Sequence, residues 1–523
     1  MSVWKALNTR RRKYRRSLIF ALIGAAIWYL VQYPLKKHFV HTNEKIPYSK
    51  FDIGSQKDDV FVHGCLDPLE YIRDPQYQKQ NATFVMLTRN QEIEGVLQTM
   101  LSIERHFNQW FQYPYVFLND EPFSEEFRQQ VGAVTTAHVR FGLVSEFEWE
   151  FPKEVRDSLL FKHSIDDQGD RGIMYGNMES YHKMCRFYSG LFYRHPMVLE
   201  YEWYWRIEPD VEFFCDTTYD PFWEMAKHGK KYGFTMVIKE LFWTVPNLFR
   251  FTKSFIRSHG LQVGTLWKMF TWDYNVLSGD AEMNKLVNYR FQIDDELKKK
   301  VLADELLSRN YASDAEVDAD MLYALVERSR QKVPIVEDKF DNEEFNLCHF
   351  WSNFEIARVD VFNNDLYNAY FQYLEESGGF WAERWGDAPV HSLGLALSLN
   401  LEDVHYFRDI GYQHSTLAHC PANKAGKQLA YTPNPAYKSV FASQDTIFAR
   451  LARTGRRATP ETNVGVGCRC DCPNRKEIED TCDECFGLWG ELLWDEHLPD
   501  VPENAAMRLK QLRLELRAEL QNR

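Results

Sequence analysis

The sequence predicts an α/β protein with a parallel sheet, and three successive segments carry this prediction. Residues 82–88 (ATFVMLT) form a short apolar run rich in β-forming side chains, which is typical of a buried strand. Apolar side chains then recur at helical spacing over residues 96–107. A second apolar run follows at residues 115–118 (YVFL). Strand, helix and strand in this order begin a parallel sheet with helices on its faces.

Later segments continue the pattern and lead to a pair of carboxylates. Residues 184–193 have helical patterning, and residues 204–207 (YWRI) and 235–238 (TMVI) are predicted to be further strands. The first of these strands runs directly into Glu208-Pro209-Asp210. Ligands of open α/β sheets bind beyond the carboxyl ends of the strands. Two carboxylates there are the oxygen ligands that Mg²⁺ or Mn²⁺ prefers, and such a metal would hold a diphosphate. By itself the triplet is more often a solvated turn.

The first forty residues predict a membrane anchor. Residues 17–33 (SLIFALIGAAIWYLVQY) carry no charge, and about 20 residues are needed to span a bilayer. Seven basic residues precede this run, and the first forty residues contain no acid. Because basic flanks stay in the cytoplasm, we expect the N-terminus in the cytosol and the remaining chain across the membrane. A cleaved signal peptide is the alternative, but no small-residue cleavage site follows the apolar run.

The charge of the chain argues against nucleic acid as a partner. The chain has 62 basic and 75 acidic residues, a net charge of −13, and nine of the basic residues lie among the first forty. The remaining chain is therefore more acidic still, whereas domains that bind nucleic acid are basic. Aromatic residues make up 15% of the chain. They suit sugar binding but also build ordinary cores.

The ten cysteines are expected to form disulfides, because the predicted topology places them in an oxidising compartment. Five of them lie in a cluster at residues 468–485, which contains CRCDC and CDEC. A zinc site is the alternative for this cluster, but its C-x-C-x-C spacing differs from the usual C-x₂-C pairs. The sequence does not determine which cysteines pair.

Two further blocks combine acids with aromatic residues. Residues 346–356 (NLCHFWSNFEI) place Glu355 among aromatic residues, where burial raises a carboxyl pKa or demands partners for the charge. Residues 378–391 (GGFWAERWGDAPVH) alternate charged side chains with tryptophan, which suits a sugar pocket. Ordinary packing with a satisfied salt bridge explains either block as well.

The chain divides into five predicted parts. Residues 1–16 are a basic cytosolic tail, residues 17–33 the transmembrane signal anchor and residues 34–78 a lumenal stem. Residues 79–486 form the catalytic domain, in which residues 282–333 are a charged helical insertion. Residues 487–523 carry leucines at helical spacing amid charges, which predicts an amphipathic helix. This helix docks on the domain or pairs with a partner.

Five blocks together resemble the fungal α-1,2-mannosyltransferases of the Kre2/Mnt1 (KTR) family, over about residues 60–440. The blocks are YHKMCRFYSGLFYRHP (181–196), EPDVEFFCD (208–216), NLCHFWSNFEI (346–356), GGFWAERWGDAPVHSLGL (378–395) and HYFRDIGYQH (405–414). The resemblance implies a type II Golgi membrane protein with a GT-A-like fold, a Rossmann-like mixed sheet flanked by helices. It also implies a Mn²⁺-dependent enzyme that transfers mannose from GDP-mannose with retention of configuration. The acceptor would be a mannosylated glycoprotein or glycolipid of fungal O-linked and N-linked mannan synthesis.

The resemblance also implies roles for single residues. Glu208 matches the family's metal-binding acid, and His414 matches the second protein ligand of the metal. Arg89 and Tyr181 match residues of the donor pocket, to which we add Asp210 from the carboxylate pair.

Two more acids are implied at the sugar. Glu355 matches the proposed nucleophile or stabiliser of an oxocarbenium ion, and Asp387 matches an acid on the acceptor side. Retention needs either a covalent mannosyl-enzyme, with a carboxylate beneath the anomeric carbon, or attack from the leaving-group face. The sequence does not choose between these mechanisms. A membrane-bound glycosidase and a catalytically silent subunit of a mannan-making complex are the alternative functions.

Overall fold

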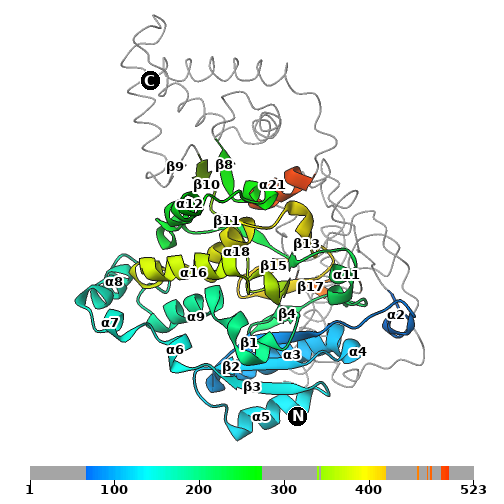
Figure 1. Ribbon diagram of the computed structural model, residues 1–523. Coiled ribbons are helices and arrows are strands. Elements are labelled where there is room, and N and C mark those ends of the chain that lie inside the picture. Colours follow the sequence, from blue (N-terminus) through cyan, green and yellow to red (C-terminus); the bar gives the residue numbers. More distant parts are fainter. Residues whose placement is uncertain are drawn as a thin grey trace, which may run out of the picture. The chain divides into compact units, whose positions relative to one another are not determined.

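The computed structural model describes residues 66–273 and 343–419, together with residues 339–340, 456–458, 468, 471–473 and 484–493 (Figure 1). The chain divides into the units Met1–Lys50 and Phe51–Arg523, and all described residues belong to the second. The predicted cytosolic tail, membrane anchor and charged insertion 282–333 lie outside the described residues. Within the described part, every helix is too short or too polar to span a bilayer.

A seven-stranded sheet organises the described part, with the strand order β13-β6-β12-β4-β1-β2-β3. Its strands, in chain order, are β1 (Ala82–Leu87), β2 (Tyr115–Asn119), β3 (Val139–Leu143), β4 (Trp203–Arg206), β6 (Tyr232–Phe234), β12 (Glu355–Arg358) and β13 (Val404–Tyr406). Neighbours pair in parallel, except that β12 runs antiparallel to both β4 and β6. The prediction of an α/β fold with a mixed sheet is therefore confirmed.

The antiparallel strand brings the start of β12 to the end of β4. In the register of this pair, Glu355 lies opposite Arg206. Glu208 follows β4 two residues later, at the carboxyl edge of the parallel strands. Two acids and an arginine from separate parts of the chain therefore lie at one edge of the sheet. Ligands of open α/β sheets bind at this carboxyl edge.

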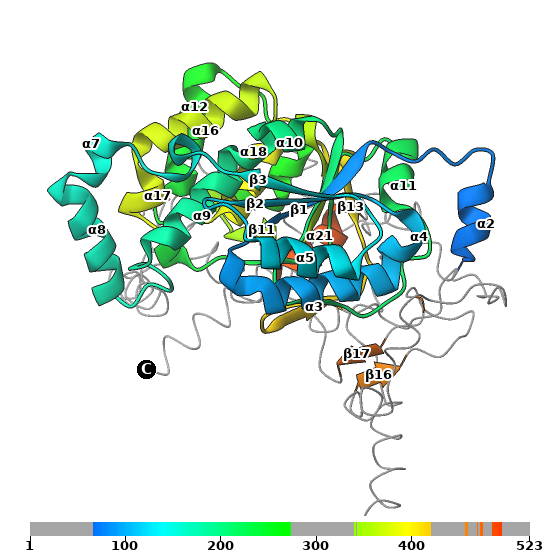
Figure 2. The ribbon, with the colours of Figure 1, turned by 90° about the horizontal axis from the view of Figure 1, so that it is seen from below.

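Alternation along β4 separates an apolar face of the sheet from a polar one. Trp203 and Trp205 belong to the main hydrophobic core, to which α3 (Ile93–Ile103), α5 (Glu125–Val134) and α11 (Pro221–Lys227) also contribute. Tyr204 and Arg206 point to the opposite face, where the ring of Tyr204 packs on Phe192 after helix α9 (Glu179–Gly190). Figure 2 shows α3 and α5 on one side of β1–β3, with α18 (Asp387–Ala396) on the other.

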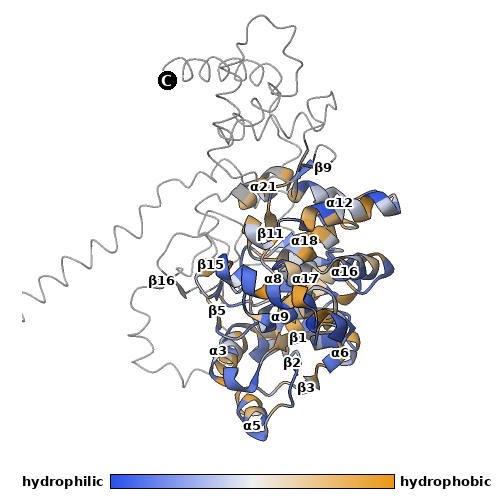
Figure 3. Cartoon of the chain, turned by 90° about the vertical axis from the view of Figure 1, so that its left-hand side faces the viewer, coloured by the Kyte–Doolittle hydropathy of each residue, from blue (hydrophilic) through white to orange (hydrophobic). Residues whose placement is uncertain are grey.

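The helices that cover the sheet carry both polar and apolar residues, as expected for helices with one face in water (Figure 3). Ser124 caps α5 by accepting a hydrogen bond from the Phe127 N–H, 3.1 Å away. The remaining α-helices of the described part are α2 (Pro68–Arg73), α4 (Gln109–Phe111), α6 (Glu146–Trp149), α7 (Lys153–Arg156), α8 (Leu159–Asp170), α10 (Pro196–Leu199), α12 (Leu248–His259), α16 (Asp365–Ser377), α17 (Gly379–Ala382) and α21 (Glu484–Leu493).

Short strands form four smaller sheets. One of them has the order β15-β14-β5, and its strand β5 begins directly after Glu208-Pro209-Asp210. Its strands are β5 (Val211–Phe213), β14 (Tyr412–His414) and β15 (Leu417–His419). The other strands are β7 (Val237–Lys239), which pairs with β11 (Cys348–Phe350), then β8 (Thr271–Asp273), β9 (Lys339–Phe340) and β10 (Glu343–Phe345), and finally β16 (Arg456–Ala458) and β17 (Asp471–Pro473).

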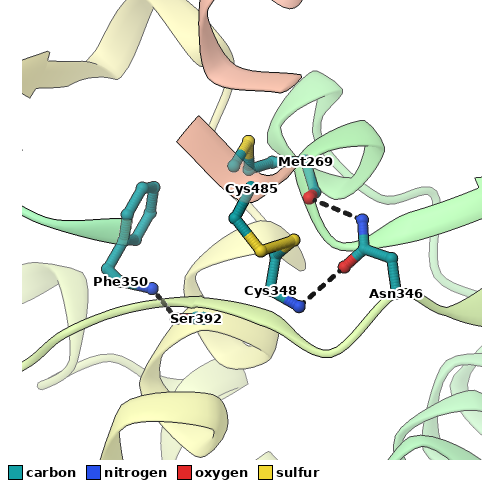
Figure 4. Close-up of a disulfide and its surroundings, with 6 residues drawn as sticks. All are labelled: Met269, Asn346, Cys348, Phe350, Ser392 and Cys485. Carbon is teal, nitrogen blue, oxygen red and sulfur yellow. Dashed lines mark hydrogen bonds between the residues drawn. A yellow bond between two sulfur atoms is a disulfide. The ribbon is translucent and has the colours of Figure 1, made fainter. Parts of the chain in front are cut away.

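A disulfide between Cys348 and Cys485 fastens α21 to β11 across 137 residues of sequence (Figure 4). The Cys348 N–H also donates to the Asn346 side-chain oxygen at 2.8 Å. Cys485 belongs to the CDEC part of the cysteine cluster, so this cysteine is bonded to sulfur as predicted. Cys185, in contrast, is a buried free thiol.

Three predicted boundaries differ from the structure. The predicted strand at residues 235–238 begins in the gap between β6 and β7 and overlaps only β7, because the chain leaves the large sheet there and pairs with β11 instead. The last residues of the predicted stem pack on the domain, since the Tyr71 hydroxyl donates to Glu224 at 2.6 Å. Helix α21 crosses the predicted boundary at residue 486, because Cys485 and Trp489 are both buried against the body.

Candidate active site

Arg206, the last residue of β4, links two acids of the predicted site. Its Nε and Nη2 atoms both lie 2.7 Å from Oε1 of Glu208. Its Nη1 atom donates to Oδ2 of Asp387, at the start of α18. The guanidinium group also lies 3.4 Å above the ring of Tyr188 in α9. The structure therefore brings together Glu208 and Asp387, which are 179 positions apart in the sequence, through Arg206, for which no role was predicted.

The pKa values of the two acids bonded to Arg206 are shifted in opposite directions. Burial raises the pKa of Glu208, and the charge of Arg206 offsets only part of this effect. Burial acts on Asp387 in the same direction, but Arg206 and His391 outweigh it and lower its pKa. Asp387 also accepts a hydrogen bond from the Ser352 hydroxyl at 2.6 Å and begins a helix, where a negative charge is favoured. Asp387 is thus the firmly ionised partner of Arg206.

His414 lies beside the carboxylates of the 208–210 turn. It ends β14, and in the register with β5 it lies opposite Val211, three residues after Glu208. Its ring packs against Trp351 with a centroid distance of 5.6 Å. Its Nδ1 atom is buried and has no hydrogen-bond partner. Burial, and then the charge of Arg206, lower the pKa of His414 and so favour the neutral imidazole that binds metals.

These residues fit a divalent metal of the Mn²⁺ type. Glu208 offers a carboxylate, and His414 offers a neutral imidazole with an unpartnered nitrogen. Over the described residues, no group of three or more His, Cys, Asp or Glu side chains is arranged as a metal site. A site with two protein ligands leaves its other positions to phosphate oxygens and water, as a catalytic site requires.

Asp210 projects from a strained turn. Its φ is +59°, a left-handed conformation that is uncommon for residues other than glycine. Its N–H donates to the carbonyl of Gly95 in α3 at 3.1 Å. A Cβ atom at Gly95 would come within 2.7 Å of the Asp210 carboxylate, so only glycine fits beneath it. The turn therefore fixes Asp210 over the first half of α3.

Arg89 and Tyr181 contact different partners. Arg89 follows β1, its side chain is 65% exposed, and its Nη2 bonds Glu92 at 2.6 Å. Glu92 acts electrostatically on both Arg89 and Glu208. Tyr181 lies between the ring of Tyr175, 4.6 Å away, and the guanidinium of Arg384, 5.4 Å away.

Glu355 is fully buried and is not part of the exposed surface of the site. The residue is 0% exposed. Its Oε1 accepts the Tyr204 hydroxyl at 2.8 Å, and its Oε2 accepts the Tyr232 hydroxyl at 3.1 Å and faces Nδ1 of His391 at 3.2 Å. The carboxylate is therefore held by three partners, one of them on α18, and its place beneath the sugar stays a prediction.

His391 connects Glu355 to the covering helices. Its Nε2 donates to the carbonyl of Tyr188 at 2.8 Å, so this nitrogen carries a proton. Its Nδ1 lies 3.2 Å from Oε2 of Glu355, and a hydrogen bond between these two atoms requires a proton on one of them. His391 lies four residues after Asp387, one turn along the same helix. That spacing could have identified it from the sequence, as the alternation in YWRI could have placed Arg206 and Tyr204 on one face.

The family comparison covers most of the chain. Residues 38–279 and 317–436 match a family model described as glycolipid 2-alpha-mannosyltransferase. A probable mannosyltransferase of Saccharomyces cerevisiae, KTR7, is 54% identical over 93% of this chain and 91% of its own length. An O-glycoside alpha-1,2-mannosyltransferase homolog 5 of Schizosaccharomyces pombe is 47% identical over 84% of this chain and 85% of its own length.

Solved structures agree with the sequence relatives. Core-mannan synthase A (CmsA/Ktr4) of Aspergillus fumigatus, solved in a Mn/GDP form, is 33% identical with a TM-score of 0.52. That match covers 71% of this chain and 83% of the synthase. The mannosyltransferase Ktr4p of S. cerevisiae in complex with GDP is 30% identical with a TM-score of 0.52, over 74% of this chain and 84% of its own. The chain therefore belongs to the glycolipid 2-alpha-mannosyltransferase family, known also as the Kre2/Mnt1 (KTR) family, and it is a mannosyltransferase.

Proposed function

We propose that this mannosyltransferase uses GDP-mannose and Mn²⁺ and adds mannose in α-1,2 linkage to a mannose-terminated glycan, with retention of configuration. The observation that carries the proposal is a neutral His414 whose Nδ1 has no hydrogen-bond partner, on a strand that pairs with the strand directly after Glu208-Pro209-Asp210. Two similar solved structures, one in a Mn/GDP form and one in complex with GDP, support the choice of donor and metal.

Glu208 and His414 would hold the metal, which when bound neutralises the diphosphate charge as GDP leaves. Arg206 holds Glu208 by two nitrogens and so fixes its carboxylate. Asp210, in its left-handed turn, and the exposed Arg89 flank the start of α3 and face the nucleotide part of the donor. The chain's own contribution here is a set of preorganised charges, the largest source of catalysis at many sites.

Asp387 holds Arg206 in place and faces the acceptor side of the sugar. Its lowered pKa keeps it ionised, so it accepts hydrogen bonds from the acceptor but does not protonate it. The neighbouring Ser352 hydroxyl is already committed to Asp387.

We favour attack from the leaving-group face over a covalent mannosyl-enzyme. As nucleophile, Glu355 would have to leave Tyr204, Tyr232 and His391 and emerge from full burial. Burial, and then Glu355 itself, raise the pKa of both tyrosine hydroxyls, so they remain donors to the carboxylate. Held there, Glu355 still supplies negative potential beneath the sugar. Mass spectrometry of enzyme quenched during turnover would show a mannose adduct on Glu355 if the covalent route holds.

We also propose a single-pass type II protein of the Golgi membrane with a lumenal catalytic domain, acting in the mannan synthesis of a fungal cell wall. The uncharged run at residues 17–33 and its basic flank support this topology. The Cys348–Cys485 disulfide supports an oxidising compartment. Protease protection in sealed Golgi vesicles tests it, since digestion without detergent would contradict a lumenal domain.

The activity is tested with the purified protein, GDP-mannose, Mn²⁺ and methyl α-mannoside. We expect transfer of one mannose to O2 of the acceptor, an α configuration in the product by NMR and loss of activity after chelation with EDTA. Release of free mannose without transfer, or equal activity in EDTA, would contradict the proposal. Replacing GDP-mannose by UDP-glucose is the matched control for the donor.

A further inference from the structure

The residue before β1 begins a sequence motif that the proposed mannosyl transfer does not use. Asn81-Ala82-Thr83 is the only Asn-x-Ser/Thr triplet in the 523 residues, and its middle residue is not proline. In a protein of the secretory pathway such a triplet is the acceptor motif for N-linked glycans. A triplet also occurs by chance in many sequences, so its place in the fold decides whether a glycan fits there.

Asn81 presents its side chain to solvent on a fixed backbone. The residue is exposed, and its carbonyl accepts the N–H groups of Glu202 and Trp203 at 2.9 and 3.1 Å, where β4 begins. Its side-chain nitrogen donates to the carbonyl of Glu200 at 2.8 Å. An asparagine amide has two N–H bonds. One of them holds this contact, and the other is available for replacement by a glycan.

The triplet lies at the edge of the sheet opposite to the candidate site. β1 runs parallel to β4, and Arg89 and Glu208 follow the carboxyl ends of these two strands. Asn81 instead precedes β1, whose six residues span about 20 Å at about 3.3 Å per residue. A glycan on Asn81 therefore leaves the proposed donor and metal positions open.

Thr83, which completes the triplet, is inaccessible in the folded protein. The residue is 0% exposed, and its hydroxyl donates to the carbonyl of Pro114 at 3.0 Å, directly before β2. β1 is paired on both sides, with β2 and with β4. Because the hydroxyl residue defines the motif, an enzyme that reads the triplet must reach Thr83. Attachment of a glycan must therefore precede the pairing of β1 with its neighbours.

We propose that Asn81 carries an N-linked oligosaccharide, which is attached before β1 joins the sheet. The side-chain nitrogen of Asn81 forms a bond to the anomeric carbon of an oligosaccharide carried on a polyprenyl diphosphate. The bond from that carbon to the diphosphate breaks, the diphosphate leaves, and the nitrogen loses one proton. Folding then buries Thr83 and leaves the glycan at the amino edge of the sheet. This inference goes beyond mannosyl transfer, but it rests on the lumenal topology proposed with it.

The test is the gel mobility of the full-length chain expressed in yeast. Peptide N-glycosidase should increase the mobility of the wild type by the loss of one glycan and should leave aspartate at position 81, which mass spectrometry of the peptides locates. Asn81→Gln keeps an amide but is no acceptor, so it should migrate like the deglycosylated wild type and should not respond to the glycosidase. Its kcat/KM for GDP-mannose should equal that of the wild type.

Two matched variants accompany this test. Thr83→Ser keeps both the triplet and a hydroxyl for the Pro114 carbonyl, so it should be glycosylated like the wild type. Asn363→Gln replaces an exposed asparagine outside any triplet and should leave the mobility unchanged. A shift in Asn363→Gln equal to that in Asn81→Gln would contradict attachment at Asn81.

The order of attachment and folding is tested on wild-type chain made in bacteria without the glycan. Offered to solubilised oligosaccharyltransferase with its lipid-linked donor, the folded chain should stay unmodified, and the reduced and unfolded chain should be modified. Equal modification of both would overturn attachment before folding.

A wild-type chain from yeast that the glycosidase leaves unchanged overturns the glycan itself. Protease protection in vesicles from the same cells then separates the two failures. Protection without detergent would show that the lumenal topology stands and that only the glycan is refuted. Digestion without detergent would refute the topology as well, while the assay of mannosyl transfer tests the proposed activity independently of both.

Discussion

At the scale of single residues, Arg206 decides how the charges of the site are arranged. It is buried, and its pKa is raised: burial disfavours the cation, but Asp387 and Glu208 outweigh that effect. A buried cation with two carboxylates and a tyrosine ring has its partners fixed in place. Such an arrangement positions Glu208 for a metal, but it also makes folding sensitive to the loss of either acid.

Asp387→Ala should therefore destabilise the protein as well as inactivate it. Arg206 would keep Glu208 as its one bonded carboxylate. Breaking a buried ion pair lowers the free energy of unfolding by about 3–5 kcal/mol. Chemical denaturation followed by fluorescence measures the change. Glu200→Ala, which opens the exposed pair between Arg140 and Glu200, is the control and should leave the midpoint unchanged. Equal stability of Asp387→Ala and wild type would contradict the proposed role of this pair.

His414→Ala should separate metal binding from folding. Because Nδ1 has no hydrogen bond in the structure, the loss of the imidazole breaks none there and costs only ring packing on Trp351. Losing even an outer partner of a metal costs 10–100-fold in affinity, so we expect at least about a 100-fold loss for Mn²⁺. Titration with Mn²⁺ in the presence of GDP measures it. The exposed His138→Ala is the control, and unchanged Mn²⁺ affinity in His414→Ala would remove this ligand from the site.

At the scale of elements, the helices that close the domain are held by long-range bonds. Asp220 caps α11, since it accepts the Phe222 N–H at 3.0 Å, and it also accepts the hydroxyls of Tyr113 at 2.6 Å and Tyr77 at 2.7 Å. Tyr77 lies at the end of the predicted stem, so this end of the stem is bonded to the domain. Burial raises the pKa of Asp220 to about 6, although these hydrogen bonds oppose the shift.

This raised pKa predicts a pH dependence of stability. Between the ordinary pKa of 3.8 and about 6, the folded protein holds a proton on Asp220 that the unfolded chain has lost. The contribution of Asp220 is therefore largest below the ordinary pKa and is lost as the pH rises through about 6. Between pH 4 and 7 the free energy of unfolding of the wild type should fall by on the order of 3 kcal/mol more than that of Asp220→Asn. Denaturation of both proteins across that range checks it, and parallel pH profiles would contradict it.

Loss of the disulfide between Cys348 and Cys485 should destabilise the protein and release helix α21 from the domain. The bond closes a segment of 137 residues, for which the loss of loop entropy corresponds to about 5 kcal/mol. Trp489 of α21 packs on Phe234 and Phe350 of the sheets, so the helix also covers core side chains. Cys485→Ser should lower the unfolding midpoint and expose α21 to limited proteolysis. Cys185→Ser changes a free thiol and serves as control; a similar effect of both would contradict a specific role.

At the scale of the whole molecule, the residues of the candidate site come from strands and helices between Arg89 and His414. Ligands that bind these parts together should stabilise the folded protein by mass action. At 100 times its dissociation constant, GDP with Mn²⁺ should add about 2.7 kcal/mol. Differential scanning fluorimetry should show a higher melting temperature with both ligands than with either alone. An identical melting temperature with and without them would count against a shared nucleotide and metal site.

The sequence alone predicted much of this molecule because its signals are local. Alternation and helical spacing located β1, α3, β2 and β4, and the strand that runs into Glu208 located the carboxyl edge. The matching blocks identified the family and, with it, suggested roles for Glu208, His414 and Asp387. These predictions depend on residues that are close along the chain or that are matched in order.

The tertiary structure decided what depends on contacts between distant segments. It paired Arg206 with Asp387 and buried Glu355 against Tyr204, Tyr232 and His391, which makes this predicted acid a residue beneath the site. It also bonded the end of the predicted stem to Asp220 and Glu224. Each of these contacts arises from strand order and helix packing, because burial and charge pairing are properties of the folded chain and not of any one segment.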